Sequence, residues 1–470
     1  MPRMGRTHGK AHGKGGGVGN RAADTAAVRS TQAAVTAAQA GVPSSRAAGG
    51  RAPGSQAPAA RATFTEVFAV GEFRALWLAM LLSVAGDQLA RVAMTVLVYD
   101  RTRSAFLTAL TYAMTLLPWL VGGIGLSGLA DRLPRRQVMI ACDLARLVLV
   151  AAMAAASLAD SAAALWAMVA LLFLVTLLDS PFKSARSALV ADILTGERYV
   201  LGTTVTQLTF QAGMVLGFAL GGVTVAALGT RGALGTDAAT FAVSALLLAL
   251  WVRRRPAAAG PRGAAKPSHW ADMAAGVRLV FGDATLRTLV LFGWLVTFYI
   301  APMALAVPYA ASFRGLPLAV GTGLMFAALP LGTTVGTFVL GRLVSPDRRQ
   351  HWMGGMAVGS CAVLMLCWAR PGFGAALVIF MVAGLFAGYQ IAANAAFVAA
   401  VPAERRGQAF GLANGGMQVF QGLWFIIVGA LAGLLGPAAV IALSGCIGTV
   451  MAIALAVRWA TRAAPLAGRS

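Results

Sequence analysis

The sequence predicts an all-α membrane protein with twelve transmembrane helices arranged as two six-helix repeats. Hydrophobic residues make up 58% of the 470-residue chain and charged residues 11%, against roughly 25% charged in soluble domains. Mean hydropathy is +0.75. From Phe64 onward, apolar runs follow one another, each about 20 residues long, which is enough for a helix to cross a hydrocarbon core of about 30 Å. A soluble multidomain protein is therefore excluded.

Twelve such runs are separated by short polar or charged segments. The predicted spans are 74–99, 104–127, 137–159, 163–181, 199–227, 232–252, 286–310, 316–341, 351–370, 374–400, 407–434 and 437–458. They divide six and six around a long basic segment with an amphipathic stretch that we expect at the membrane surface. The expected domains are a basic tail, a first bundle, the central loop, a second bundle and a C-terminal tail: 1–62, 63–252, 253–285, 286–460 and 461–470.

The formal net charge of +22 needs an explanation, because a basic protein could bind nucleic acid. Residues 1–61 hold nine Lys and Arg residues and a single acid, Asp24. With few apolar residues this tail is predicted to be disordered, and it lacks the apolar core of a secretory signal. It is interpreted as an inert tail or the result of a start site assigned too early. The alternative is attraction to anionic lipid or nucleic acid.

The remaining basic residues predict the orientation. Including the tail, 31 Lys and Arg fall on the side of the N-terminus, five on the other side and two within helices. Since cytoplasmic loops carry the excess of Lys and Arg, both termini are predicted to be cytoplasmic, in a multi-pass protein of the cell membrane. The bilayer accounts for the charge, and no nucleic-acid partner is expected.

The two halves match each other weakly at nearly one offset. Phe-Arg-Ala-Leu at 73–76 corresponds to Leu-Arg-Thr-Leu at 286–289, which is 213 residues later. The Glu-Arg pair at 197–198 corresponds to that at 404–405, which is 207 residues later. Two matches at similar offsets favour two parallel repeats.

The segment 127–136 carries the most specific motif, Ser-Gly-Leu-Ala-Asp-Arg-Leu-Pro-Arg-Arg. It resembles the cytoplasmic signature Gly-x-Leu-x-Asp-Arg-x-Gly-Arg-Arg of the major facilitator superfamily, with Ser127 and Pro134 replacing the two glycines. The resemblance implies the major facilitator fold, specifically the bacterial twelve-helix drug and siderophore efflux type. It assigns a cytoplasmic gate to Asp131, Arg132, Arg135 and Arg136. Alternatively, the arginines are only positive-inside anchors, which leaves Asp131 unexplained.

Two further segments fit the same family. Residues 341–349 repeat the loop motif in degraded form at the equivalent place of the second half. In span five, Gly213, Gly217, Gly221 and Gly222 are similar to the family's antiporter signature, with Phe218 where the signature has proline. Helix packing by small residues accounts for these glycines equally well.

Ionisable residues inside span one are the main candidates for function. Asp87 and Arg91 share a helix face because they are four residues apart, and Gln88 lies beside it. Charged groups at this depth usually face an aqueous cavity or each other. We expect Asp87 to carry a proton and Arg91 to tune it or to hold an acidic group. The alternative is an intrahelical ion pair that neutralises itself.

Other polar residues suggest a gate and a cavity. Asp143 and Arg146, three residues apart in span three, and Asp179 in span four are expected to join the gate network rather than transport protons. Trp119 and a set of weakly polar residues could line a wide amphipathic cavity or bond between helices: Tyr112, Gln207, Gln211, Tyr299, Tyr389, Gln390, Asn394, Asn414, Gln418 and Gln421.

The predicted function is secondary active transport, as a proton-coupled antiporter that exports small amphipathic molecules by alternating access. A phosphate-binding loop, paired cysteines and a nucleophile set are missing from the sequence, so we expect no enzyme, metal or cofactor. The expected partners are small-molecule cargo, protons and lipid, with the chain acting as a monomer. The alternatives are an importer of the same fold, a dedicated metabolite or siderophore exporter and, from another class, a non-transporting membrane sensor.

Overall fold

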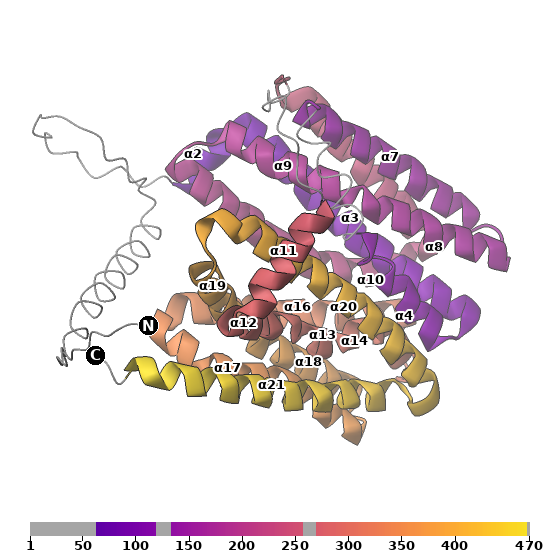
Figure 1. Cartoon of the computed structure of the whole chain (residues 1–470). Helices are drawn as coiled ribbons and strands as arrows, with labels where there is room; N and C mark the ends of the chain where they lie inside the picture. Colours follow the sequence, from indigo (N-terminus) through magenta and orange to yellow (C-terminus); the bar gives the residue numbers. More distant parts are fainter. Residues whose placement is uncertain (1–62, 119–132, 257–268, 468–470) are drawn as a thin grey trace, which may run out of the picture. The chain divides into compact units, whose positions relative to one another are not determined.

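The apolar runs form α-helices, because a helix satisfies its backbone N–H and C=O groups within its own segment. The computed structural model describes residues 63–118, 133–256 and 269–467, without a strand among them. The helices of the first half (Figure 1) are α2 (Phe64–Ala69), α3 (Gly71–Thr102), α4 (Ala105–Ala113), α7 (Arg135–Ala156), α8 (Ala162–Leu177), α9 (Asp179–Ile193) and α10 (Glu197–Trp251).

The second half continues the same pattern with shorter pieces. Its helices are α11 (His269–Gly282), α12 (Ala284–Trp294), α13 (Val296–Tyr299), α14 (Ala301–Ala304), α15 (Ala306–Ala310), α16 (Leu318–Leu343), α17 (Pro346–Ala362), α18 (Phe373–Ala387), α19 (Gln390–Ala400), α20 (Arg406–Leu435) and α21 (Pro437–Ala467), with 3₁₀ segments η1 (Val363–Ala369) and η2 (Ala403–Arg405). The all-helical architecture is confirmed.

Ten helical segments in the described part are long and apolar enough to cross a membrane. The predicted fifth and sixth spans both fall within α10, a 55-residue helix that leaves helical geometry at Gly229 (φ 68°, ψ 176°). The predicted second span begins with α4 and runs into residues 119–132, outside the described residues. The total of twelve spans stays a prediction.

The predicted fourth span, 163–181, corresponds to two consecutive helices, α8 and α9, which together run from Ala162 to Ile193. The segment does not end near Pro181, because Pro181 is the third residue of α9. A proline in the first turn of a helix removes no intrahelical hydrogen bond. Lys183 and Arg186 consequently belong to a segment of membrane-spanning length.

Side chains at the N-caps show why several helices begin where they do. Ser104 accepts from the backbone N–H of Leu107 at 3.2 Å, and Asp283 accepts from that of Leu286 at 2.9 Å. Such caps satisfy backbone donors that have no partner inside the helix, each with a contribution of about 1 kcal/mol.

Glycines bring α10 close to α3. A Cβ atom built on Gly213 would lie 3.0 Å from Val84, one on Gly217 would lie 3.1 Å from the backbone of Ala85, and one on Gly221 would lie 3.1 Å from that of Leu89. Their four-residue spacing places them on one face of α10. Small residues at these positions allow close approach of the two backbones.

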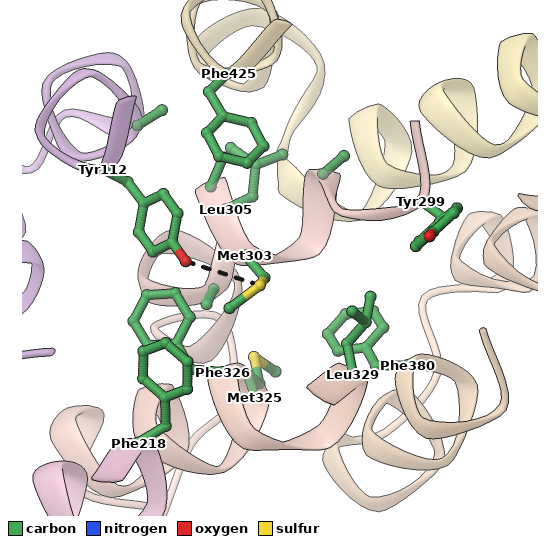
Figure 2. Close-up of a cluster of buried hydrophobic side chains, with 14 of the residues drawn as sticks. Tyr112, Phe218, Tyr299, Met303, Leu305, Met325, Phe326, Leu329, Phe380 and Phe425 are labelled. Carbon is green, nitrogen blue, oxygen red and sulfur yellow. Dashed lines mark hydrogen bonds between the residues drawn. The ribbon is translucent and has the colours of Figure 1, made fainter. Parts of the chain in front are cut away.

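The two halves meet along a seam of glycine and aromatic residues. Gly222 of α10 faces α16, where an added Cβ would lie 2.5 Å from the carbonyl oxygen of Ala319. Beside this contact, the Tyr112 hydroxyl donates to the Met303 sulfur at 3.7 Å. The Phe218 and Phe326 rings are 5.1 Å apart. Figure 2 shows this cluster, which joins α4 and α10 of the first half to α14 and α16 of the second.

Candidate functional site

A small chamber of about 140 Å³ lies between the first half and α20 of the second. Pockets for drug-sized ligands usually measure roughly 300–1,000 Å³, so in this conformation the chamber accommodates part of such a molecule. Its wall consists of α3 residues, residues of α9 and α10, and single contributions from the chain after α4 and from α20: Ser83, Val84, Asp87, Gln88, Arg91, Leu116, Asp179, Phe182, Lys183, Arg186, Phe210, Met214 and Gln418.

Helical periodicity explains which charged residues reach this wall. On α3, Asp87 and Arg91 are one turn apart, and on α9, Asp179, Lys183 and Arg186 follow at intervals of four and three residues. Residues with these spacings share a helix face. The structure thus brings predicted residues from three separate segments together: the span-one pair with Gln88, Asp179 and Gln418.

Asp87 and Arg91 do not neutralise each other. No salt bridge joins them in the described part of the chain, and Arg91 Nη1 instead donates to Gln88 Oε1 at 3.2 Å. The Asp87 carboxylate, which lines the chamber, has no hydrogen-bond or ion-pair partner among the described residues. The alternative of a self-neutralising intrahelical pair therefore does not describe this arrangement.

Asp179 is the centre of a buried ion network. Its Oδ1 accepts from Arg146 Nη2 at 3.0 Å, and its Oδ2 pairs with the Lys183 ammonium. The Arg146 side chain is completely buried, and its guanidinium lies 5.1 Å from the centre of the Phe182 ring. A buried guanidinium needs such partners, because leaving it unpaired costs several kcal/mol.

Asp143 and Arg146, three residues apart on α7, form no salt bridge with each other in the described part of the chain and bond to other residues. Asp143 Oδ2 accepts from the Ser244 hydroxyl at 2.6 Å, since α7 packs against α10. Arg146 points to Asp179 of α9 instead, and its Nη1 donates to Ser83 Oγ at 3.4 Å. Asp143 and Arg146 are both fully buried, so they lie in the wall behind the chamber.

Asp237 is a buried carboxyl group that the sequence interpretation missed. It is completely buried, Thr240 Oγ1 donates to its Oδ1 at 3.4 Å, and its Oδ2 has no partner among the described atoms. It packs against Gly86, where an added Cβ would overlap its carboxylate. The available signal was an acid within the apolar run 232–252.

The predicted gate loop is described only in part. Asp131 and Arg132 lie outside the described residues, as does Trp119. Arg135 pairs with Asp192 at the end of α9. Arg136 donates to the carbonyl of Leu248 at 3.0 Å. Basic side chains at helix C-termini satisfy carbonyls that have no partner within the helix.

Several predicted cavity residues lie elsewhere. Tyr389 donates to the carbonyl of Phe292 at 2.8 Å, and Gln390 donates to the Tyr299 hydroxyl at 3.2 Å, so these side chains bond helices of the second half together. Tyr112 and Gln421 are buried at the seam and in α20. Outside this chamber, the remaining predicted positions are half-buried or exposed: Gln207, Gln211, Asn394 and Asn414.

The family follows from a comparison of the whole sequence. The sequence pattern of the Major Facilitator Superfamily matches residues 76–369 and 320–470. The chain belongs to the major facilitator superfamily. The resemblance predicted from the loop motif at 127–136 is confirmed, and the chain is a multi-pass membrane protein of a transporter family.

Curated relatives of this major facilitator protein include exporters. The enterobactin exporter EntS of Salmonella choleraesuis is 27% identical over 307 residues, which cover 64% of this chain and 70% of the relative. The multidrug efflux pump Tap of Mycolicibacterium fortuitum is 26% identical over 301 residues, with coverages of 62% and 72%.

Solved structures show the same fold at low identity. A bacterial homologue of the iron transporter ferroportin in an inward-facing state superposes with a TM-score of 0.60 at 14% identity, covering 84% of this chain and all of that one. A POT family transporter gives a TM-score of 0.63 at 11% identity, with coverages of 82% and 95%. The predicted major facilitator fold is confirmed.

Proposed function

We propose that this major facilitator protein exports small amphipathic molecules by proton-coupled antiport, with Asp87 as the proton-carrying carboxylate. The observation that carries the proposal is the half-buried Asp87 side chain, which faces the chamber without a cation partner among the described residues. An ionisable group in a transmembrane segment is costly and usually marks a transport pathway. The exporters among the curated relatives support the direction.

Alternating access requires two bodies that rock around a site between them. The chamber lies where α3, α9 and α10 of the first half approach Gln418 of the second, and the glycine and aromatic seam joins the same two halves. In the proposed cycle, the two halves separate along the seam on one side of the membrane while they close on the other side. In the proposed topology both termini and the loop at 127–136 lie on the cytoplasmic side, where the loop would help to close the transport pathway.

Antiport needs cargo and proton to occupy the chamber alternately. When Asp87 is ionised, its carboxylate attracts the cargo, and when it is protonated, that attraction is lost. A proton from the outside would therefore favour cargo release and permit return of the empty carrier. The Asp179 carboxylate already has two cation partners, so the proposed cycle gives it no role in proton transfer.

The test is uptake of fluorescent amphipathic dyes into inverted membrane vesicles energised with a proton gradient. We expect proton-driven uptake with the unaltered chain and its loss with Asp87→Asn. Asp160→Asn, which removes an exposed carboxylate between α7 and α8, is the matched control and should transport normally. Unchanged uptake by Asp87→Asn would remove Asp87 from the mechanism. If a proton gradient drives no uptake by the unaltered chain, the exporter proposal itself fails.

A further inference from the structure

We propose that the chamber selects amphipathic cargo whose head group carries both an acidic and a cationic group. This inference rests on the proposed export function and names its cargo class. Three charged side chains carry it: Asp87 and Arg91 on α3, and Arg186 on α9, all of which line the chamber. They are the complement of a head group that bears both signs of charge.

The other ions of the wall already have partners. Asp179 pairs with Arg146 and with Lys183, so this carboxylate and the two cations hold one another in place. The side chains of Asp87 and Arg186 have no hydrogen-bond or ion-pair partner among the described residues. The Arg91 guanidinium donates to the neutral Gln88 amide and to the hydroxyl of Tyr112, so no described carboxylate pairs with it. One carboxylate and two guanidinium groups are thus left for cargo.

The other elements around the chamber contribute only uncharged side chains among the described residues. The chain after α4, α10 and α20 contribute Leu116, Phe210 and Met214, and the neutral amide of Gln418. Asp143 and Asp237 are fully buried behind the wall, where the hydroxyl groups of Ser244 and Thr240 donate to them. The charge pattern that cargo meets is therefore that of α3 and α9 alone.

Asp87 and Arg91 form no ion pair in the described part of the chain, although they lie one helical turn apart. Residues four apart on a helix can form an ion pair, and such a pair would reduce the local charge of both groups. Here Arg91 points to Gln88 instead, so the acid and the base remain separately available. Unpaired charges in a membrane protein carry a desolvation cost, which a ligand with complementary charges offsets.

The apolar side chains of the wall would contact the apolar part of the cargo. Phe210 faces the chamber, with the Lys183 ammonium 5.6 Å from the centre of its ring, and Met214 lies one turn further along α10. At about 140 Å³, the chamber accommodates the charged head group and the adjoining apolar atoms. An acidic group would lie against Arg91 and Arg186, and a cationic group against Asp87.

Four forms of one compound separate the contributions of the two charges. Naphthylalanine carries both charges, its amide only the cation, its N-acetyl derivative only the anion, and its N-acetyl amide neither. We would measure binding of each to the purified full-length chain by isothermal titration calorimetry. Charge-assisted hydrogen bonds contribute about 1.5–3 kcal/mol each, so naphthylalanine should bind about tenfold or more tightly than either singly charged form.

Two substitutions make the assignment specific. Arg186→Gln should weaken naphthylalanine binding toward that of the amide, and should tighten binding of the cationic amide, because a like charge is removed from the chamber. Asp87→Asn should weaken it to that of the N-acetyl acid, and should tighten binding of that acid. Arg458→Gln, which removes an exposed guanidinium on α21, is the control and should bind all four compounds normally.

Each outcome decides the inference. If the amide binds as well as naphthylalanine, the acid-binding role of Arg91 and Arg186 is refuted. If the N-acetyl acid binds as well, the role of Asp87 in holding a cationic group is refuted. If none of the four binds while dye uptake in inverted vesicles is intact, the cargo class is wrong and the proposed exporter function stands. If the unaltered chain shows no proton-driven dye uptake, the proposed exporter function fails instead.

Discussion

The two halves of the molecule bury different kinds of polar side chains. In the first half, the buried side chains that the structure describes include four ionisable ones, namely Asp143, Arg146, Asp179 and Asp237. The buried polar side chains described in the second half are neutral, such as Thr297, Ser360 and Ser444. A neutral hydroxyl or amide needs one partner, whereas a buried ion needs a counter-ion as well.

This difference assigns separate roles to the two halves. Ser444 of α21 donates to the carbonyl of Phe298 at 2.7 Å, and Tyr389 donates to that of Phe292 at 2.8 Å. Both bonds hold helices of the second half together. In the first half, charged side chains of α3 and α9 line one chamber, where Asp179 is paired with Lys183. The second half therefore buries neutral polar groups, whereas the first half carries the charged side chains that line the chamber.

The largest loss of stability is expected on substitution of Asp179, in the charged first half. Asp179→Ala leaves the buried Arg146 guanidinium and Lys183 without their shared carboxylate, which should cost about 3–5 kcal/mol. Thermal unfolding in detergent, followed by size-exclusion chromatography, measures the loss. Asp179→Ala combined with Arg146→Met should recover part of it, because the second change removes the unpaired charge. A single variant as stable as the unaltered chain would contradict the network.

An intermediate effect is expected at the seam between the halves. Gly323→Ala places a methyl group 2.6 Å from the carbonyl oxygen of Phe218, so α10 and α16 must separate, at a cost of about 1–3 kcal/mol. Distances between spin labels on the two helices, measured by electron paramagnetic resonance, should increase. Gly235→Ala is the control, since an added Cβ there meets no atom within 4 Å. Unchanged distances in Gly323→Ala would show that the seam tolerates the methyl group.

The smallest effect is expected in the neutral half. Tyr389→Phe removes the hydroxyl that donates to the Phe292 carbonyl, at a cost of about 0.5–1.5 kcal/mol, the net contribution of a typical hydrogen bond. Thermal unfolding should detect this loss, while the affinity for naphthylalanine stays within about twofold, since Tyr389 does not line the chamber. A large loss of affinity without loss of stability would overturn the division of roles between the halves.

Local features of the chain made much of the chamber predictable. The four-residue spacing of Asp87 and Arg91 places both on one face of α3 wherever that helix packs, and both line the chamber. The contribution of α9 was harder to predict, because the expected fourth span ended at residue 181, whereas α8 and α9 together run to Ile193. Asp237 was missed because its importance depends on Gly86 of another helix.

The sequence by itself determined the membrane class, the family and the segments that carry intramembrane charge, because run length, motif and helical spacing are properties of the chain alone. Only the tertiary structure decided which charges are paired. Arg146 binds Asp179 rather than Asp143, and Asp87 is left facing the chamber. Ion pairing depends on which helix lies alongside, and residues distant in sequence meet there only through packing.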